Sequence, residues 1–271
     1  MSFVVARNRP LAAALRQAAL AENRRALHHL AGDSAEDIHE TRKSLKRLRA
    51  WLRLLRPQLG ERYDVLNALL RDAGRRLAGR RDADVARETL RSLRRGRLLD
   101  AGEYARLQRW LSADPVAAPA LAAASDEARA LMEAAQIYFA HLDPGPLDAA
   151  TLDEALARSH ARCRRRWRAA HKSPTPEALH EWRKTVKELA TQHALLAPRV
   201  KGAKADTQAL RTLGEVLGRH HDHHQLALRL EGLPLPDAKR LGRRLHDALR
   251  RRQLQLEADA LRRGAALFDE G

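Results

Sequence analysis

Apolar residues recur along this chain at the spacing of a helical face, and no stretch alternates apolar with polar residues long enough to indicate a strand. Leu, Ala and Arg dominate, and β-branched residues are sparse. The pattern therefore predicts an all-α protein. The predicted helices cover about residues 8–31, 34–56, 60–79, 82–95, 101–112, 119–141, 148–171, 175–197, 203–219, 222–231 and 236–267.

Two of these helices have clear start and stop signals. Ser34 with Asp37 resembles a capping box at the start of the first, whereas Thr175 precedes Pro176, a residue suited to the first position of a helix. Each helix is then followed by a proline that cannot continue it. The two prolines are Pro57 and Pro198.

The same two helices carry an internal repeat. IHETRKSLK over residues 38–46 matches LHEWRKTVK over residues 179–187. Further matches pair Leu70, Gly74, Leu77 and Asp82 with Leu210, Gly214, Leu217 and Asp222, and Arg24 and Arg25 with Arg165 and Arg166. We therefore expect one domain over residues 1–271, made of repeat halves 1–142 and 147–271 with about four helices each.

Each motif helix places a basic stripe beside an apolar stripe that is expected to face the core. In the first helix the apolar stripe comprises Ile38, Thr41, Leu45, Leu48, Leu52 and Leu55, and the basic stripe comprises His39, Arg42, Lys46, Arg49 and Arg53. In the second helix the apolar stripe comprises Leu179, Trp182, Val186, Leu189 and Leu196, and the basic stripe comprises His180, Arg183 and Lys187.

The charge of the chain indicates an anionic partner. Lys and Arg number 51 against 34 Asp and Glu, which gives a formal net charge of +17. Such an excess is typical of proteins that bind nucleic acid, an anionic membrane or a phosphate polymer. Glu40 is the one acid between His39 and Arg56, so the first stripe has no local relief of its repulsion. It is either a merely solubilising face or an anion site in which Arg, Lys and His donate to phosphate oxygens.

Other functions have weaker support in the sequence. The HHDHH segment over residues 220–224 places His220 and His223 or His224 on one helical face, as metal ligands would be, but the matching RRDAD segment favours an anion instead. The His-Glu pairs lack the second histidine of a zinc protease. Asp82 and Asp222 are interpreted as N-caps or ion-pair partners rather than catalytic acids. We therefore expect no metal, no cofactor and no catalytic residue.

Sequence-independent nucleic-acid binding is the main alternative, and a metalloenzyme that processes phosphate esters or polyphosphate is a weaker one. Aromatic residues make up only 4% of the chain, and Trp51, Trp182 and Tyr138 lie within apolar patterns, so a base-stacking platform is not expected. The N-terminus lacks the order of a signal peptide, and no window is apolar enough to span a bilayer. The lone Cys163 excludes an internal disulfide. A cytoplasmic protein without membrane contact is expected.

The duplicated histidine-plus-basic helix, each copy followed by a Leu/Gly helix that ends near an aspartate, resembles the CHAD family, the conserved-histidine α-helical domain. This resemblance covers nearly the whole chain. It implies two four-helix bundles related by a pseudo-twofold axis, with basic faces lining a central cleft or pore, and non-catalytic binding of inorganic polyphosphate. It also suggests association with polyphosphate granules, whereas the oligomeric state is not predicted. Nothing here resembles the alternating-glutamate strands of the triphosphatase domain that accompanies some members.

The second motif helix departs from the first at positions where Glu188, Ala190, Gln192 and Ala194 replace Arg47, Arg49, Trp51 and Arg53. The second half is therefore expected to bind less tightly per turn. The predicted polyphosphate-binding residues are Arg24, Arg25, His39, Arg42, Lys43, Lys46, Arg49, Arg53, Arg76, Arg80, Arg81, Arg165, Arg166, His180, Arg183, Lys184, Lys187, Arg219, His220 and His221.

Overall fold

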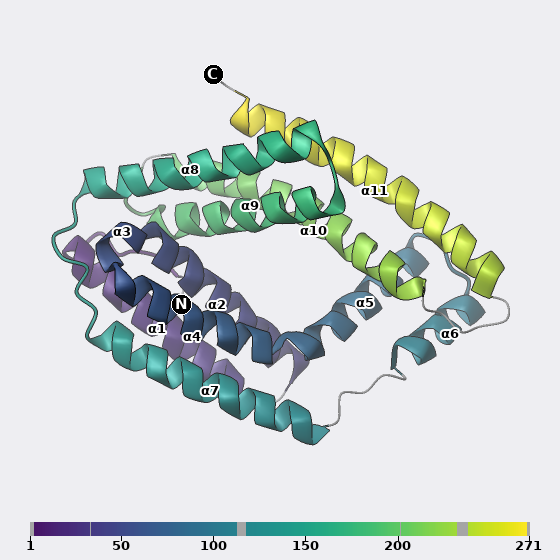
Figure 1. The fold of residues 1–271 in the computed structure, drawn as a ribbon, viewed down its shortest axis with the longest axis horizontal. Helices are drawn as coiled ribbons and strands as arrows, with labels where there is room; N and C mark the ends of the chain where they lie inside the picture. The colour runs from purple at the N-terminus through teal and green to yellow at the C-terminus, as the bar shows by residue number, and fades with distance from the viewer. Residues whose placement is uncertain (1–2, 33, 113–117, 201, 232–237, 270–271) are drawn as a thin grey trace. The chain divides into compact units, whose positions relative to one another are not determined.

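The computed structural model describes residues 3–32, 34–112, 118–200, 202–231 and 238–269, and within these ranges all regular secondary structure is helical, as predicted (Figure 1). The helices in the described ranges are α1 (Leu11–Ala31), α2 (Ala35–Leu54), α3 (Arg56–Leu59), α4 (Glu61–Arg76), α5 (Ala78–Arg95), α6 (Ala101–Ser112), α7 (Ala118–Ala140), α8 (Ala149–Lys172), α9 (Pro176–Leu196), α10 (Ala203–Leu230) and α11 (Ala238–Phe268).

The caps of the two motif helices are confirmed. Ser34 Oγ accepts a hydrogen bond from the Asp37 amide at 3.1 Å, so Ser34 begins α2. Thr175 Oγ1 likewise accepts from the Ala178 amide at 3.1 Å, and Pro176 is the first residue of α9. These bonds satisfy amide donors that have no partner within a helix.

One predicted boundary is wrong, and the short helix α3 was not predicted as a separate element. The expected break near residues 220–221 does not exist, because Leu217, His220, His223 and Leu226 form one buried face that α10 keeps through both predicted segments. Pro57 does end α2, but α3 follows at once with this proline in its first turn, where the missing amide costs nothing.

The N-cap interpretation of both aspartates is wrong as well. Helix α5 begins at Ala78, so Asp82 lies inside it, and Asp222 lies well inside α10. The N-cap residue must precede the first helical turn, where amides lack partners. The other interpretation of these residues, as ion-pair partners, stays a prediction.

The chain folds into two compact units, which are described separately. Unit 1 comprises Met1–Arg81, Val116–Arg162 and Lys187–Leu210, and unit 2 comprises Asp82–Pro115, Cys163–Val186 and Arg211–Gly271. The division into repeat halves 1–142 and 147–271, and the pseudo-twofold axis between them, remain predictions.

Unit 1 contains a four-helix bundle. Helices α1, α2, α4 and α7 pack against one another, as Figure 1 shows. Their core includes Trp51 of α2 and Phe139 of α7, whose rings meet edge to face with centroids 5.8 Å apart. The six residues of the predicted apolar stripe on α2 are all buried, which confirms that this stripe faces the core.

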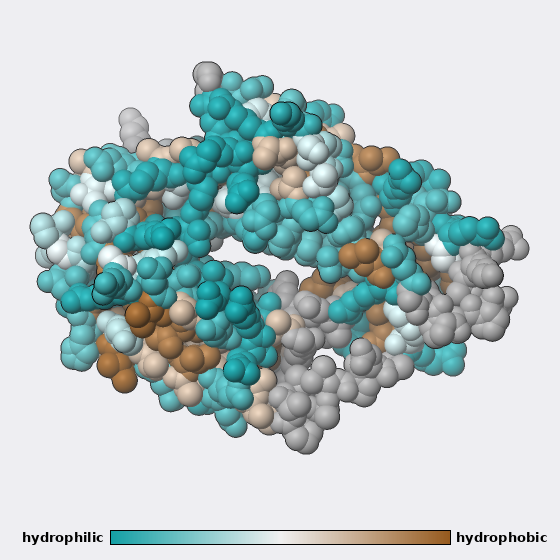
Figure 2. Space-filling model, in the orientation of Figure 1, coloured by the Kyte–Doolittle hydropathy of each residue, from teal (hydrophilic) through white to brown (hydrophobic). Residues whose placement is uncertain are grey.

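Unit 2 has a leucine-rich core formed by α5, α6, α10 and α11, with Leu90, Leu107 and Leu249 fully buried. Trp182 of α9 is also fully buried, as its place in the predicted apolar stripe indicated. The surface shown in Figure 2 is largely hydrophilic, with scattered hydrophobic residues. No helix among the described residues combines the length and the apolarity that crossing a membrane requires.

Tyr138 is not part of the core, although its sequence context suggested an apolar environment. Helix α7 turns Met132, Ala135 and Phe139 inward, and Tyr138 lies one residue off that face. Its exposed fraction is 43%, and the neighbouring Ile137 is 64% exposed. The position of Tyr138 within an apolar pattern of the sequence therefore does not make it a core residue.

Candidate functional site

The basic stripe of α2 lies in unit 1, and α4 orients two of its arginines. We call His39, Arg42, Lys46, Arg49 and Arg53 the α2 stripe. Arg42 Nη1 donates a hydrogen bond to the Gly74 carbonyl at 2.7 Å. Arg49 Nε donates to Asn67 Oδ1 at 3.1 Å. Because both acceptors belong to α4, these guanidinium groups are partly ordered before any ligand arrives, which lowers the entropic cost of binding.

One half-buried carboxylate lies at the C-terminal end of the α2 stripe. Glu188 of α9 forms an ion pair with Arg53 at 3.3 Å and a second with Arg162 of α8. Burial raises the pKa of Glu188, although Arg53 and Arg162 act in the opposite direction. The pKa of Arg49 is lowered, first by burial and then by the charge of Arg53. The positive charge at this end of the stripe therefore exceeds what one carboxylate neutralises.

The repulsion among the cations of the α2 stripe is thus reduced by acidic residues of other helices rather than by residues of α2. The expectation that its charges stack without relief considered only neighbours along the helix. Glu22 of α1 forms an ion pair with Arg47 at 2.9 Å, on another part of α2, and Glu188 lies far away in sequence. These contacts depend on how the helices pack, and no local pattern predicts them.

The glutamate of each His-Glu pair holds the lysine of the motif. Glu40 accepts a hydrogen bond from Lys43 Nζ at 2.9 Å and forms an ion pair with Arg25 at 3.3 Å. Glu181 accepts in the same way from Lys184. The hydrogen bond from the lysine is the largest cause that lowers the pKa of each glutamate. The spacing of three residues between Glu and Lys was visible in the sequence, but its effect on Lys43 and Lys184 was missed.

The second motif meets the histidine segment of α10 within unit 2. His180 Nδ1 and His221 Nδ1 lie 3.2 Å apart, with ring centroids at 4.3 Å. Burial and the charge of His180 lower the pKa of His221 to about 3, with Arg183 adding to the effect. Burial, Arg183 and Lys184 lower the pKa of His180 as well. Both imidazoles are therefore neutral at pH 7, and a phosphate group beside them would favour their protonated forms.

Two other histidines of the HHDHH segment, His220 and His223, face the protein interior. His220 and His223 are buried, and burial lowers the pKa of each to about 4. No group of three or more His, Cys, Asp or Glu side chains in the described part of the chain is arranged to hold a metal ion. His220 presents little surface to an external ligand, whereas His221 is only half-buried.

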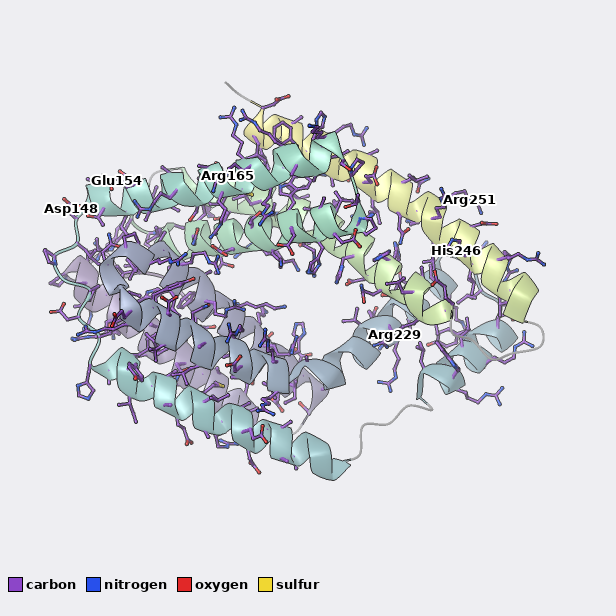
Figure 3. All side chains as sticks on the ribbon, in the orientation of Figure 1. Asp148, Glu154, Arg165, Arg229, His246 and Arg251 are labelled. Carbon is purple, nitrogen blue, oxygen red and sulfur yellow. The ribbon has the colours of Figure 1, made fainter. Side chains whose placement is uncertain are left out.

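The remaining predicted residues are mostly exposed. Arg76 forms an ion pair with Glu127 at 2.8 Å. Arg165 projects from α8 (Figure 3). The side chains of Arg80 and Arg81 lie outside the described part of the structure. The other exposed members are Arg24, Lys46, Arg166, Lys187 and Arg219.

A comparison with protein-family models matches residues 11–231 to the CHAD domain. The matched segment covers both motif helices, the His-Glu pairs and the histidine segment of α10. No match is found among curated proteins.

Proposed function

Because the chain belongs to the CHAD domain family, we propose that it binds inorganic polyphosphate on its basic helical faces and does not cleave it. The resemblance to this family implies a polyphosphate ligand. The α2 stripe and the motif residues of α9 are the surfaces that we assign to this function.

The observation that carries the proposal is the crowding of cations on the α2 stripe. Arg49 is half-buried beside Arg53, and Arg53 shares Glu188 with Arg162. Burial and then the charge of Arg53 lower the pKa of Arg49, and a bound anion would oppose both effects. Arginine forks suit phosphate oxygens because they donate two parallel hydrogen bonds.

The length of the stripe favours a polymer over a single phosphate. His39 and Arg53 are separated by about 21 Å along α2, at about 1.5 Å per residue. A single phosphate group could contact only cations that lie close together and could not reach along the whole stripe. A linear phosphate chain could contact the whole stripe and gain affinity from each contact by the release of counterions.

Single-stranded nucleic acid has less support. Trp51 of α2 and Trp182 of α9 are fully buried, so neither ring is available for a base to stack on. Exposed Tyr138 lies on α7 and belongs to neither motif. Duplex DNA, which would be bound through its phosphates alone, remains the competitor that an experiment must separate.

The test is a competition between long-chain polyphosphate and duplex DNA, matched in phosphate concentration, for the purified protein at about 0.15 M salt. We expect polyphosphate to displace DNA, and DNA to displace polyphosphate poorly. Displacement of polyphosphate by an equal concentration of DNA would refute the assignment. Shortening of the polyphosphate chain during incubation with a divalent metal would refute the proposal that the protein is not an enzyme.

The proposed ligand also implies a location. We propose that the protein is cytoplasmic and associates with polyphosphate granules, and a fluorescent fusion imaged together with a polyphosphate stain tests this. A fusion that stays diffuse in cells containing granules would contradict it.

A further inference from the structure

A cavity lies between α5 and α6 in unit 2, on residues that belong to neither motif. Its volume is about 350 Å³, and its lining residues are Arg91, Arg94, Arg95 and Tyr104. This volume is at the lower end of the range typical of small-molecule sites, about 300–1,000 Å³. The lining combines an aromatic ring with three guanidinium groups, which is a composition suited to a ligand that is both planar and anionic.

The aromatic part of the cavity is a stacked pair. The Arg94 guanidinium lies over the Tyr104 ring, with Cζ 4.8 Å from the ring centroid. Such a cation–π contact holds the guanidinium group over the ring by electrostatic attraction. Guanidinium planes and aromatic rings are both surfaces on which nucleobases stack.

The two other arginines would bind the anionic part of the ligand. Arg91 Nη1 lies 2.6 Å from one oxygen of Glu88, and Arg95 Nη2 lies 3.0 Å from the other. One carboxylate thus brings these guanidinium groups together, and it neutralises only one of them. A phosphate group has more oxygens and more charge than this carboxylate, so it could replace Glu88 as the shared acceptor.

The turn between the two helices is constrained. Arg97 has a φ of 56°, a left-handed conformation that is uncommon for a residue other than glycine. The Arg97 amide donates to the Arg94 carbonyl at 2.9 Å, and the Leu98 amide donates to the Leu93 carbonyl at 3.0 Å. These bonds hold the end of α5 close to α6 and so keep Arg94 beside Tyr104.

We propose that this cavity binds a nucleotide. The base stacks on the Arg94–Tyr104 pair. The phosphates accept hydrogen bonds from Arg91 and Arg95 in place of Glu88. The site shares no residue with the α2 stripe or with the motif of α9, so this inference does not depend on polyphosphate binding. A nucleotide fits better than inorganic phosphate because a phosphate alone would leave the stacked pair unused.

The test compares ATP, tripolyphosphate and adenosine by calorimetric titration of the full chain at about 0.15 M salt. We expect ATP to bind with one-to-one stoichiometry and about tenfold more tightly than tripolyphosphate, since stacking of one base contributes about that factor. Adenosine should bind more weakly than ATP. Equal affinities for ATP and tripolyphosphate would show that charge alone is recognised and would overturn the proposal.

Variants locate the site. Tyr104→Phe keeps the ring and should keep the preference for ATP, whereas Tyr104→Leu should reduce ATP binding to the level of tripolyphosphate. Arg91→Gln with Arg95→Gln should weaken ATP at least about tenfold, since each arginine donates charge-assisted bonds. The control, with the same loss of charge at exposed positions of α11, is Arg250→Gln with Arg251→Gln. An equal loss in the control, or an unchanged ATP preference in a Tyr104→Leu protein that circular dichroism shows to be folded, would place the nucleotide elsewhere and refute the site.

Discussion

Gly264 allows two tryptophans of unit 2 to pack against α11. A Cβ built on this glycine would lie 2.5 Å from Trp167 Cδ1 and 2.7 Å from Trp182 Cη2, well inside contact distance. Gly264→Ala should therefore destabilise the protein by about 1–3 kcal/mol, because rigid indole rings must move to admit the methyl group. The midpoint of urea unfolding measures this loss.

Gly242, on the same helix, provides the matched control. A Cβ at this position meets no atom within 4 Å. Gly242→Ala should raise stability by about 0.4–1 kcal/mol, because alanine restricts the unfolded chain without a clash. If both alanines raised the midpoint, helix propensity rather than packing around the tryptophans would decide the outcome.

A second feature at the scale of single residues is a chain of polar groups around buried His193 in unit 1. His160 Nε2 and His193 Nε2 lie 2.7 Å apart, and His193 Nδ1 lies 3.5 Å from Asp206 Oδ2. Burial lowers the pKa of His193 to about 4, with His160 adding to the effect and Asp206 opposing it. Burial also lowers the pKa of His160. The folded state therefore favours neutral histidines at this position.

The consequence is a loss of stability in acid. An unfolded histidine titrates near pH 6.5, so between pH 6.5 and about 4 the unfolded chain binds a proton that folded His193 does not. The stabilisation is complete above pH 6.5 and is lost as the pH falls toward 4, at up to about 1.4 kcal/mol per pH unit. His193→Gln should reduce this slope by about one proton in urea unfolding. The control is the same substitution at exposed His246, His246→Gln (Figure 3). An unchanged slope in His193→Gln would disprove the role of His193.

At the scale of whole helices, the sequence predicted those features that depend only on residues close together in the chain. Ser34 and Pro176 begin their helices as expected, because capping involves only residues within one turn. The apolar stripe of α2 identified its core face, since periodicity reflects burial. The unbroken α10 was missed because its continuity depends on packing, which outweighs the modest helix propensity of His and Asp.

In the candidate site, too, the sequence predicted the residues of one helix but not their contacts with other helices. The α2 stripe was visible as a pattern of cations, but the partners that orient it, Asn67, the Gly74 carbonyl and Glu188, lie on other helices. The pairing of His180 with His221 was missed as a contact, although both residues were among the predicted ligands. Contacts between helices depend on their relative placement, about which a single sequence carries no direct signal.

Glu188 yields a prediction at the helix scale, because it neutralises cations that the proposed ligand would use. Glu188→Gln should strengthen polyphosphate binding about fivefold, equivalent to about 1 kcal/mol for one partly exposed ion pair. The same change should lower the melting temperature, since Arg53 and Arg162 lose their carboxylate partner. Fluorescence titration and thermal unfolding measure the two effects. Weaker binding in a folded Glu188→Gln protein would show that the end of the stripe near Arg53 does not contact the ligand.

For the whole molecule, the question is whether a net charge of +17 or a particular surface binds the anion. A charge effect alone would be equal for every exposed arginine, because nonspecific attraction follows the total charge. A bound polymer would instead depend on the residues that touch its phosphates. The control variant for this question replaces three exposed arginines outside the motifs with Gln: Arg16, Arg250 and Arg251.

The test variant replaces Arg42, Lys46 and Arg49 of the α2 stripe with Gln. The logarithm of affinity falls with the logarithm of salt in proportion to the phosphates neutralised, so the slope should flatten by up to about three units, and affinity should fall by orders of magnitude. Arg42 and Arg49 each lose a hydrogen bond to α4, which costs about 1 kcal/mol apiece, while relief of repulsion acts in the opposite direction. Melting temperatures measured in parallel therefore separate lost binding from lost folding. The control should bind nearly as the parent does. Equal losses of affinity and slope in both variants would mean that polyphosphate responds to net charge, and that the α2 stripe is a solvated face rather than a binding site.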